Sequence, residues 1–281
     1  MEKLSQFLPD NYDKTAKLAI LAGKGEYPSI LKDKLDALGI PNVLMAFEDE
    51  TSQELWERYP DGERYCTNVG QLGHLLKNLK KVGAKYAIMA GQITPKKLFK
   101  GLKLDLKATI IMATLKRKNA ETIFGAIANE LSKIDVEMLD ARSFLDDDLA
   151  PLGSFCGKKP SVLPEHIEHG MNIARECARL DIGQGCVVSR GTVVAVEAFE
   201  GTDVMIERAG TFGAKDCIFA KTVKPNQDYR FDVPVIGERT IRKLANANIK
   251  NVVVEANKVI ILQKELVKKL AEENEIKIFG I

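Results

Sequence analysis

The chain has 281 residues, of which 45% are hydrophobic and 28% are charged, so it is long enough for one large globular domain or two ordinary ones. Its net charge is +2 with both signs interspersed, which gives no support to nucleic-acid binding through a basic surface. No apolar run approaches the roughly 20 residues of a membrane span, and the five scattered cysteines form no CxxC pair. These features predict a cytoplasmic globular protein with reduced thiols.

The first half alternates short apolar runs with the spacing of amphipathic helices. A first apolar run ends in a glycine turn and is followed by a helical pattern and then by a second apolar run. This order is typical of a βαβ unit with a buried parallel sheet. We expect strands at 17–22, 42–47, 86–90 and 136–139, and helices at 28–38, 72–82 and 123–131. The predicted fold class is therefore α/β, with a Rossmann-like open parallel sheet in residues 1–141.

Residues 142–163 lack this periodicity and are rich in proline, glycine and aspartate, which predicts a linker between two domains. The alternation resumes in residues 164–281, where we expect a hairpin at 186–196 and further strands between helices. This second half is predicted to be a mixed α/β domain with at least one antiparallel pair.

Two glycine turns follow predicted strands, Gly23-Lys24-Gly25 early in the chain and Gly91-Gln92 later. Glycines between a strand and a helix let backbone N–H groups approach an anion, and both turns are expected at the ligand-binding edge of the sheet. However, the first turn is not GxGxxG and lacks the spacing of a Walker A loop. A phosphate cradle and an ordinary tight turn both remain open.

Carboxylates gather after another predicted strand, where Glu197 and Glu200 precede Gly201, Thr202 and Asp203. Gly-Thr-Asp at the start of a helix is typical of an N-cap, in which Thr202 or Asp203 would accept from the free N–H groups of the helix. Capping accounts for these two residues but not for the two glutamates. The residues alone therefore favour capping over a carboxylate-lined site.

A polar stretch further on combines Lys224, Gln227, Asp228, Arg230 and Asp232. Lysine and arginine clamp phosphate oxygens, and two carboxylates can hold a hard cation such as Mg²⁺ and orient a water molecule. The alternative is a solvated turn built on the adjacent proline and asparagine. The residues leave both interpretations open.

Short segments along most of the chain resemble those of one family. They are LAGKGEYP at 21–28, VGQLG at 69–73, MAGQI at 89–93, LDIGQ at 180–184, VAVEAFEGTD at 194–203, KPNQD at 224–228 and RFDVPVIG at 230–237. In this order they resemble the two-domain UDP-2,3-diacylglucosamine pyrophosphatases of lipid A biosynthesis, the type unrelated to metallophosphoesterases. The chain departs from the family pattern at Lys24, where glycine is usual, and in the stretches 117–121 and 211–216.

The resemblance implies hydrolysis of the pyrophosphate of UDP-2,3-diacylglucosamine to UMP and 2,3-diacylglucosamine 1-phosphate, with Mg²⁺ or Mn²⁺ and a substrate cleft between the two domains. It implies that Asp228, Asp232 and Glu197 are the catalytic carboxylates, and that Asp228, Asp203 and Glu200 hold the metal. The substrate-binding residues that it implies are Gly23, Lys24, Gly25, Gln71, Gly91, Gln92, Gly201, Thr202, Lys224, Gln227 and Arg230, with Lys224 and Arg230 on the phosphates.

The partner that the resemblance implies is an acylated UDP-sugar. It is also compatible with peripheral contact with the inner membrane of a Gram-negative-type bacterium and with a homodimer. No nucleic-acid partner is expected. The main alternative is a non-catalytic protein that binds a nucleotide-sugar or a lipid on the same fold. An oxidoreductase is disfavoured because the GxGxxG fingerprint is missing.

Overall fold

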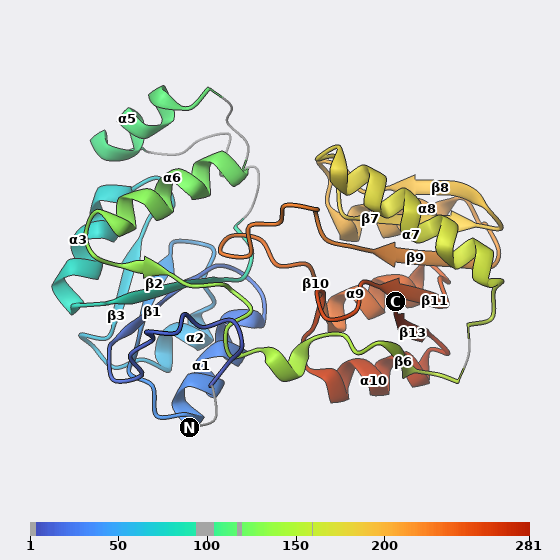
Figure 1. The fold of residues 1–281 in the computed structure, drawn as a ribbon, viewed down its shortest axis with the longest axis horizontal. Coiled ribbons are helices and arrows are strands. Elements are labelled where there is room, and N and C mark those ends of the chain that lie inside the picture. Colours follow the sequence, from blue (N-terminus) through green and yellow to red (C-terminus); the bar gives the residue numbers. More distant parts are fainter. Residues whose placement is uncertain (1–3, 94–103, 117–119, 159) are drawn as a thin grey trace. The chain divides into compact units, whose positions relative to one another are not determined.

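The structure, a computed structural model, describes residues 4–93, 104–116, 120–158 and 160–281. It divides into two compact units, residues 1–144 with 228–232 and residues 145–227 with 233–281 (Figure 1). Each unit is built on a sheet of its own, parallel in the first and mixed in the second. The predicted fold class, an open parallel sheet followed by a mixed α/β domain, is therefore confirmed. Residues 117–119, in one of the departures from the family pattern, lie outside the described residues.

Five parallel strands form the sheet of the first unit, in the order β3-β2-β1-β4-β5. They are β1 (Leu18–Ala22), β2 (Asn42–Phe47), β3 (Arg64–Thr67), β4 (Tyr86–Ala90) and β5 (Glu137–Met138). Strand β1 is buried along its whole length and pairs with β2 on one side and β4 on the other, as expected of a central parallel strand. Edge strand β3 was not predicted, because its largely half-exposed side chains form no apolar run.

Helices cover both sides of this sheet (Figure 1). They are α1 (Tyr27–Ala37), α2 (Gln53–Glu57), α3 (Leu72–Val82), α5 (Leu106–Thr114) and α6 (Ala120–Ser132). The predicted leucine stripe of α3 is confirmed, because Leu72, Leu75, Leu76 and Leu79 are buried in one core with residues of β1, β2 and α6. The helix ends where Gly83 adopts the left-handed conformation, with φ of 68°. Helices α2 and α5 were not predicted from the sequence.

Six strands form the main sheet of the second unit, in the order β6-β13-β11-β9-β7-β8. The strands of this unit are β6 (Gly153–Cys156), β7 (Gly185–Ser189), β8 (Thr192–Val196), β9 (Cys217–Lys221), β10 (Val235–Ile236), β11 (Asn251–Val254), β12 (Ile260–Ile261) and β13 (Lys277–Gly280). Strands β9, β11 and β13 are parallel, whereas β7 and β8 form the predicted antiparallel hairpin. Strands β10 and β12 pair separately, in parallel.

The helices of the second unit lie on opposite faces of its sheet (Figure 1). They are α7 (Pro164–Arg179), α8 (Thr202–Thr211), α9 (Glu238–Asn246) and α10 (Lys264–Glu273), with a short 3-10 turn, η1, at Asp146–Asp148. Met171 and Ala174 of α7 pack against one set of alternate strand residues. Helices α8, α9 and α10 pack against the other set, in the larger core. Glu197 and Lys224 lie in the loops that follow β8 and β9, at the carboxyl end of these strands.

Two short segments lie outside the domains expected from the sequence. Strand β6, within the expected linker 142–163, pairs antiparallel with β13 and so extends the sheet of the second unit. Residues 228–232, within the expected domain 164–281, belong to the first unit. There Phe231 packs against the core and stacks on Phe124 with ring centroids 6.3 Å apart. Segments of four or five residues are too short for a periodic pattern to reveal their tertiary partners.

Candidate active site

The two glycine turns of the first unit pair with each other through their backbones. The N–H of Lys24 donates to the carbonyl of Gln92 (2.8 Å), the N–H of Gln92 donates to the carbonyl of Lys24 (3.0 Å), and the N–H of Gly23 donates to Ala90 (2.8 Å). A Cβ on Gly23 would lie 2.6 Å from the Gln92 carbonyl oxygen. A tight turn therefore accounts for the glycine here, and a phosphate cradle would need donors other than these three amides.

Gly91 is required by the same pairing for two reasons. Its φ is 86°, in the left-handed region, and a Cβ there would overlap the carbonyl oxygen of Lys24. Gly25 also has a positive φ, 93°, but faces open space. The side chain of Lys24 extends from the turn to within 3.7 Å of the carboxylate of Glu50, whose side chain is fully buried. Lys24 is thus the one cation among the predicted residues of this turn.

Gln71 lies at the start of α3, in the same unit. It is the N-cap residue, yet its side chain makes no capping hydrogen bond. Its backbone N–H donates to the carbonyl of Asn68 at 2.9 Å. The amide side chain is therefore not committed to capping the helix.

Asp228 and Arg230 form a closed ion pair in the segment that belongs to the first unit. The guanidinium donates from Nε to Oδ1 (2.9 Å) and from its terminal nitrogen to Oδ2 (2.7 Å), and the backbone N–H of Arg230 adds a third bond at 3.1 Å. The Arg230 hydrogen bond is the main reason why the pKa of Asp228 lies below its usual range. The same bond raises the pKa of Arg230. Both groups are therefore charged at neutral pH.

The residues around this pair fix it on the first unit. The N–H of Ala141 donates to the carbonyl of Tyr229 at 2.8 Å. The guanidinium of Arg142 lies 3.4 Å from the centroid of the Tyr229 ring, a cation–π contact. Arg142 is itself held by a bidentate bond to Asp140. Asp228 and Arg230, together with Asp232 in the same segment, are thereby placed by the first unit although most of the flanking chain belongs to the second.

Lys224 and Gln227 lie in the second unit, in the loop that follows β9. The side-chain oxygen of Gln227 accepts the N–H of Lys224 at 3.1 Å, and the N–H of Gln227 donates to the carbonyl of Lys224 at 3.1 Å. The ammonium of Lys224 is paired with the carboxylate of Asp181, which follows α7. The reciprocal bonds make this a defined turn that holds a lysine at its start.

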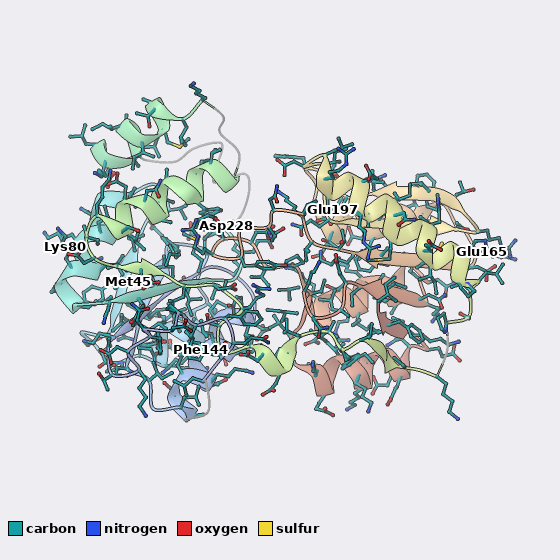
Figure 2. The ribbon with its side chains drawn as sticks, viewed as in Figure 1. Met45, Lys80, Phe144, Glu165, Glu197 and Asp228 are labelled. Carbon is teal, nitrogen blue, oxygen red and sulfur yellow. The ribbon has the colours of Figure 1, made fainter. Side chains whose placement is uncertain are left out.

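Glu197, labelled in Figure 2, belongs to a buried polar cluster where β8 gives way to α8. The Thr202 hydroxyl donates to Oε1 of Glu197 (2.8 Å), and the Lys221 ammonium donates to the Thr202 oxygen (2.9 Å). The ammonium lies 3.9 Å from Oε2 of Glu197, and the Lys221 and Glu197 side chains are only 8% and 14% exposed. Lys221 was not among the site residues predicted from the sequence. A lysine at the end of a buried strand nevertheless indicates a buried group of opposite charge.

The capping interpretation of Thr202 and Asp203 is wrong. Gly201 is the N-cap of α8, with φ of 81°, and no side chain caps the helix. Thr202 uses its hydroxyl within the buried cluster, and Asp203 pairs with Arg239 at 2.7 Å. A neighbouring carboxylate and a distant arginine outcompete the helix N–H groups because charge-assisted hydrogen bonds are the stronger ones.

The predicted metal ligands are each paired with an arginine. Glu200 lies 2.6 Å from Arg208, and hydrogen bonds, first that of its own backbone N–H, lower its pKa. Asp203 pairs with Arg239, and Asp228 with Arg230. In the described parts of the chain, no three His, Cys, Asp or Glu residues form a group that could hold a metal ion. Within each unit, the donor set therefore does not fit a ready-made cation site.

Comparisons with known proteins agree with this architecture. Residues 17–148 match the family model described as the LpxI N-terminal domain, and residues 151–279 match that of the LpxI C-terminal domain. A curated relative, the UDP-2,3-diacylglucosamine pyrophosphatase LpxI of Caulobacter vibrioides, is 30% identical over 279 residues, which covers 94% of this chain and 97% of the relative.

The parallel sheet of the first unit and the mixed sheet of the second, each with a family model of its own, define a two-domain α/β protein of one class along nearly the whole chain. The chain belongs to the LpxI family. The family expected from the seven short segments is thereby confirmed.

Proposed function

We propose that this chain hydrolyses the pyrophosphate of UDP-2,3-diacylglucosamine to UMP and 2,3-diacylglucosamine 1-phosphate in lipid A biosynthesis. The observation that carries the proposal is the match, over 94% of the chain, to a relative with that activity in its name. The polar groups support it, because a pyrophosphate needs cations held in place and the loops after β9 present both a lysine and an arginine. The cellular site that we propose is the cytoplasm, peripheral to the inner membrane.

Asp228 is proposed to orient Arg230 against the phosphates. Because its pKa is lowered, the carboxylate is a poor proton acceptor at neutral pH and suits positioning better than general-base chemistry. A guanidinium held in a bidentate bond keeps its remaining N–H donors in a fixed direction, which favours binding of the planar oxygens of a phosphoryl group. Lys224, held by Asp181, is proposed as the second phosphate contact.

The test of this role is the substitution Asp228→Asn, which keeps the shape of the side chain but removes its charge. We expect kcat to fall by roughly 100-fold or more, the loss typical of a group that stabilises charge in the transition state. The measurement is UMP release from the acylated substrate. Asp61→Asn is the matched control, because Asp61 also pairs with an arginine, Arg64, but at an exposed position away from the proposed site. Near-normal turnover of Asp228→Asn would contradict the assignment.

A divalent cation, Mg²⁺ or Mn²⁺, is proposed as a requirement, with Asp228, Asp203 and Glu200 as its ligands. Each of these carboxylates is paired with an arginine and would have to exchange that partner for the ion. At Asp228 the metal role is therefore an alternative to the orientation of Arg230, and we derive no step through the ion. EDTA is expected to abolish UMP release, and Mg²⁺ in excess over the chelator to restore it. Full activity of a metal-stripped sample would refute the requirement without affecting the proposed reaction.

The alternative, a non-catalytic protein that binds a nucleotide-sugar or a lipid, is tested by the same assay. Both functions predict binding of the acylated UDP-sugar, but only the enzyme releases UMP in proportion to its concentration. Equal hydrolysis of UDP-glucosamine without acyl chains would contradict the proposed substrate class. A homodimer remains a prediction, to be checked by light scattering of the purified protein.

A further inference from the structure

Helix α5 presents large apolar side chains to solvent. Leu106 is 78% exposed and Ile110 is 54% exposed, and Leu104, just before the helix, is 37% exposed. Leu106 and Ile110 are four residues apart, so they lie on the same face of the helix. Figure 1 shows α5 at the margin of the first unit, beyond α6. Such grouped apolar exposure is typical of a surface that binds a partner.

Helix α5 is held in place by polar anchors at its N-terminus and by one buried residue opposite the exposed face. Asp105 caps the helix by accepting the N–H of Ala108 at 2.9 Å, and its second oxygen accepts the N–H of Gly73, in the first turn of α3, at 2.6 Å. The ammonium of Lys107 lies 2.6 Å from the carboxylate of Glu130 on α6. Ala108 is buried against α3 and α6. The helix is thus oriented with Leu106 and Ile110 outward by specific bonds.

The sequence around α5 is strongly basic. Between residues 94 and 118 there are eight lysines and arginines and a single acidic residue, Asp105, a local charge of +7. Because the whole chain carries only +2, the remaining residues sum to −5. The lysines and arginine that flank the helix in sequence are Lys96, Lys97, Lys100, Lys103, Lys116, Arg117 and Lys118. An apolar helical face within a basic segment favours an anionic lipid surface over other partners.

We infer that α5 docks the protein onto an anionic phospholipid bilayer, with Leu104, Leu106 and Ile110 entering the boundary between head groups and acyl chains. The contact is peripheral, since no helix among the described residues is long and apolar enough to cross a membrane. The inference rests in part on the proposed function, because a diacylated substrate resides at a membrane surface. Because α5 is anchored to α3 and α6, its exposed face can contact the bilayer without unfolding of the first unit.

The test is sedimentation of the full-length protein with vesicles of phosphatidylcholine alone and with vesicles of phosphatidylcholine mixed with the anionic lipid phosphatidylglycerol. The wild type should bind only the anionic vesicles, and binding should weaken at high salt. Leu106→Gln with Ile110→Gln should lower the partition coefficient about tenfold or more, because two apolar side chains no longer enter the bilayer. Glutamine is chosen because it keeps helix propensity.

The matched control is Leu152→Gln with Leu163→Gln, at positions that are 75% and 53% exposed in the second unit. This control should bind like the wild type, and both double variants should keep the wild-type melting temperature and UMP release from substrate in detergent micelles. Equal binding by the α5 variant and the control would overturn the inference, as would wild-type protein that ignores anionic vesicles. A change from dimer to monomer in the α5 variant, without a change in vesicle binding, would instead identify an interface between copies and also overturn it.

Vesicle binding is measured without substrate, so the inference and the proposed function fail separately. Protein that binds anionic vesicles through α5 but releases no UMP would leave the docking surface intact and refute the enzyme. Protein that releases UMP from micellar substrate but does not bind vesicles would do the reverse.

Discussion

Lys221 illustrates how a single residue gains its meaning from tertiary contacts. Its side chain is only 8% exposed, and its ammonium contacts the Thr202 hydroxyl and the Glu197 carboxylate. Lys221 is the last residue of the buried strand β9, and its aliphatic stem is buried with the strand. Burial of two opposite charges is tolerated because each compensates the other.

At this scale we predict that Lys221→Met destabilises the protein by about 3 kcal/mol, because it leaves the buried carboxylate of Glu197 without its cation. Glu197→Gln combined with Lys221→Met should lose less than the sum of the two single changes, by about 1 kcal/mol or more. The measurement is the free energy of unfolding in urea, followed by circular dichroism. Strict additivity of the two losses would show that the pair is not coupled.

At the scale of the element, the two glycine turns of the first unit act as one paired structure rather than as two loops. The turn after β1 and the turn after β4 are joined by the backbone bonds between Lys24 and Gln92. Parallel neighbours end at the same edge of a sheet, so the close approach follows from the register of β1 and β4. Only glycine fits at positions 23 and 91, because a Cβ at position 23 would lie 2.6 Å from the Gln92 carbonyl oxygen and a Cβ at position 91 would overlap the Lys24 carbonyl oxygen.

Two alanine substitutions separate backbone strain from steric overlap in this paired turn. Gly25→Ala should cost about 1 kcal/mol, because only its positive φ opposes a side chain. Gly91→Ala should cost roughly 3 kcal/mol or more, because the new Cβ would also overlap the carbonyl oxygen of Lys24. The fluorescence of Trp56, the single tryptophan, reports unfolding of this unit in urea. Equal losses of unfolding free energy in the two variants would mean that the turns move apart to accommodate the new Cβ at position 91.

For the whole molecule, the carboxylates decide how stability depends on pH. Hydrogen bonds to the charged form are the leading cause of a lowered pKa at Asp13, Glu130, Glu200 and Asp228. In the unfolded chain such groups titrate near their ordinary values of about 3.9 for Asp and 4.3 for Glu. The unfolded state therefore binds more protons in the acid range, and its formation is favoured as the pH falls.

We accordingly expect a nearly constant contribution from these carboxylates above about pH 5 and a progressive loss below about pH 4, as the pH falls through the folded-state pKa values. The measurement is the melting temperature at pH 7, 5, 4 and 3, with a sample returned from pH 3 to pH 7 as the control for irreversible damage. An unchanged melting temperature between pH 5 and pH 3 would contradict the assigned ion pairs.

Much of the architecture follows from local pattern, because periodicity is a property of neighbouring residues. The strands at 42–47 and 86–90, the leucine stripe of α3 and the hairpin of β7 and β8 are all present as predicted. Helix α5 escaped prediction because its apolar residues lie on both sides: Leu106 and Ile110 are exposed, whereas Ala108 and Ile111 pack against the core.

The sequence by itself determined the fold class, the family and the short segments that carry the candidate residues, since these depend on composition, periodicity and motif order. Only the tertiary structure decided which partner each side chain has. It placed residues 228–232 on the first unit and joined the two glycine turns. It also paired the Thr202 hydroxyl with the Glu197 carboxylate rather than with the N–H groups of the helix. The physical reason is that hydrogen bonds and ion pairs form between groups distant in sequence, where neither spacing nor residue type states which of several competing partners is nearest.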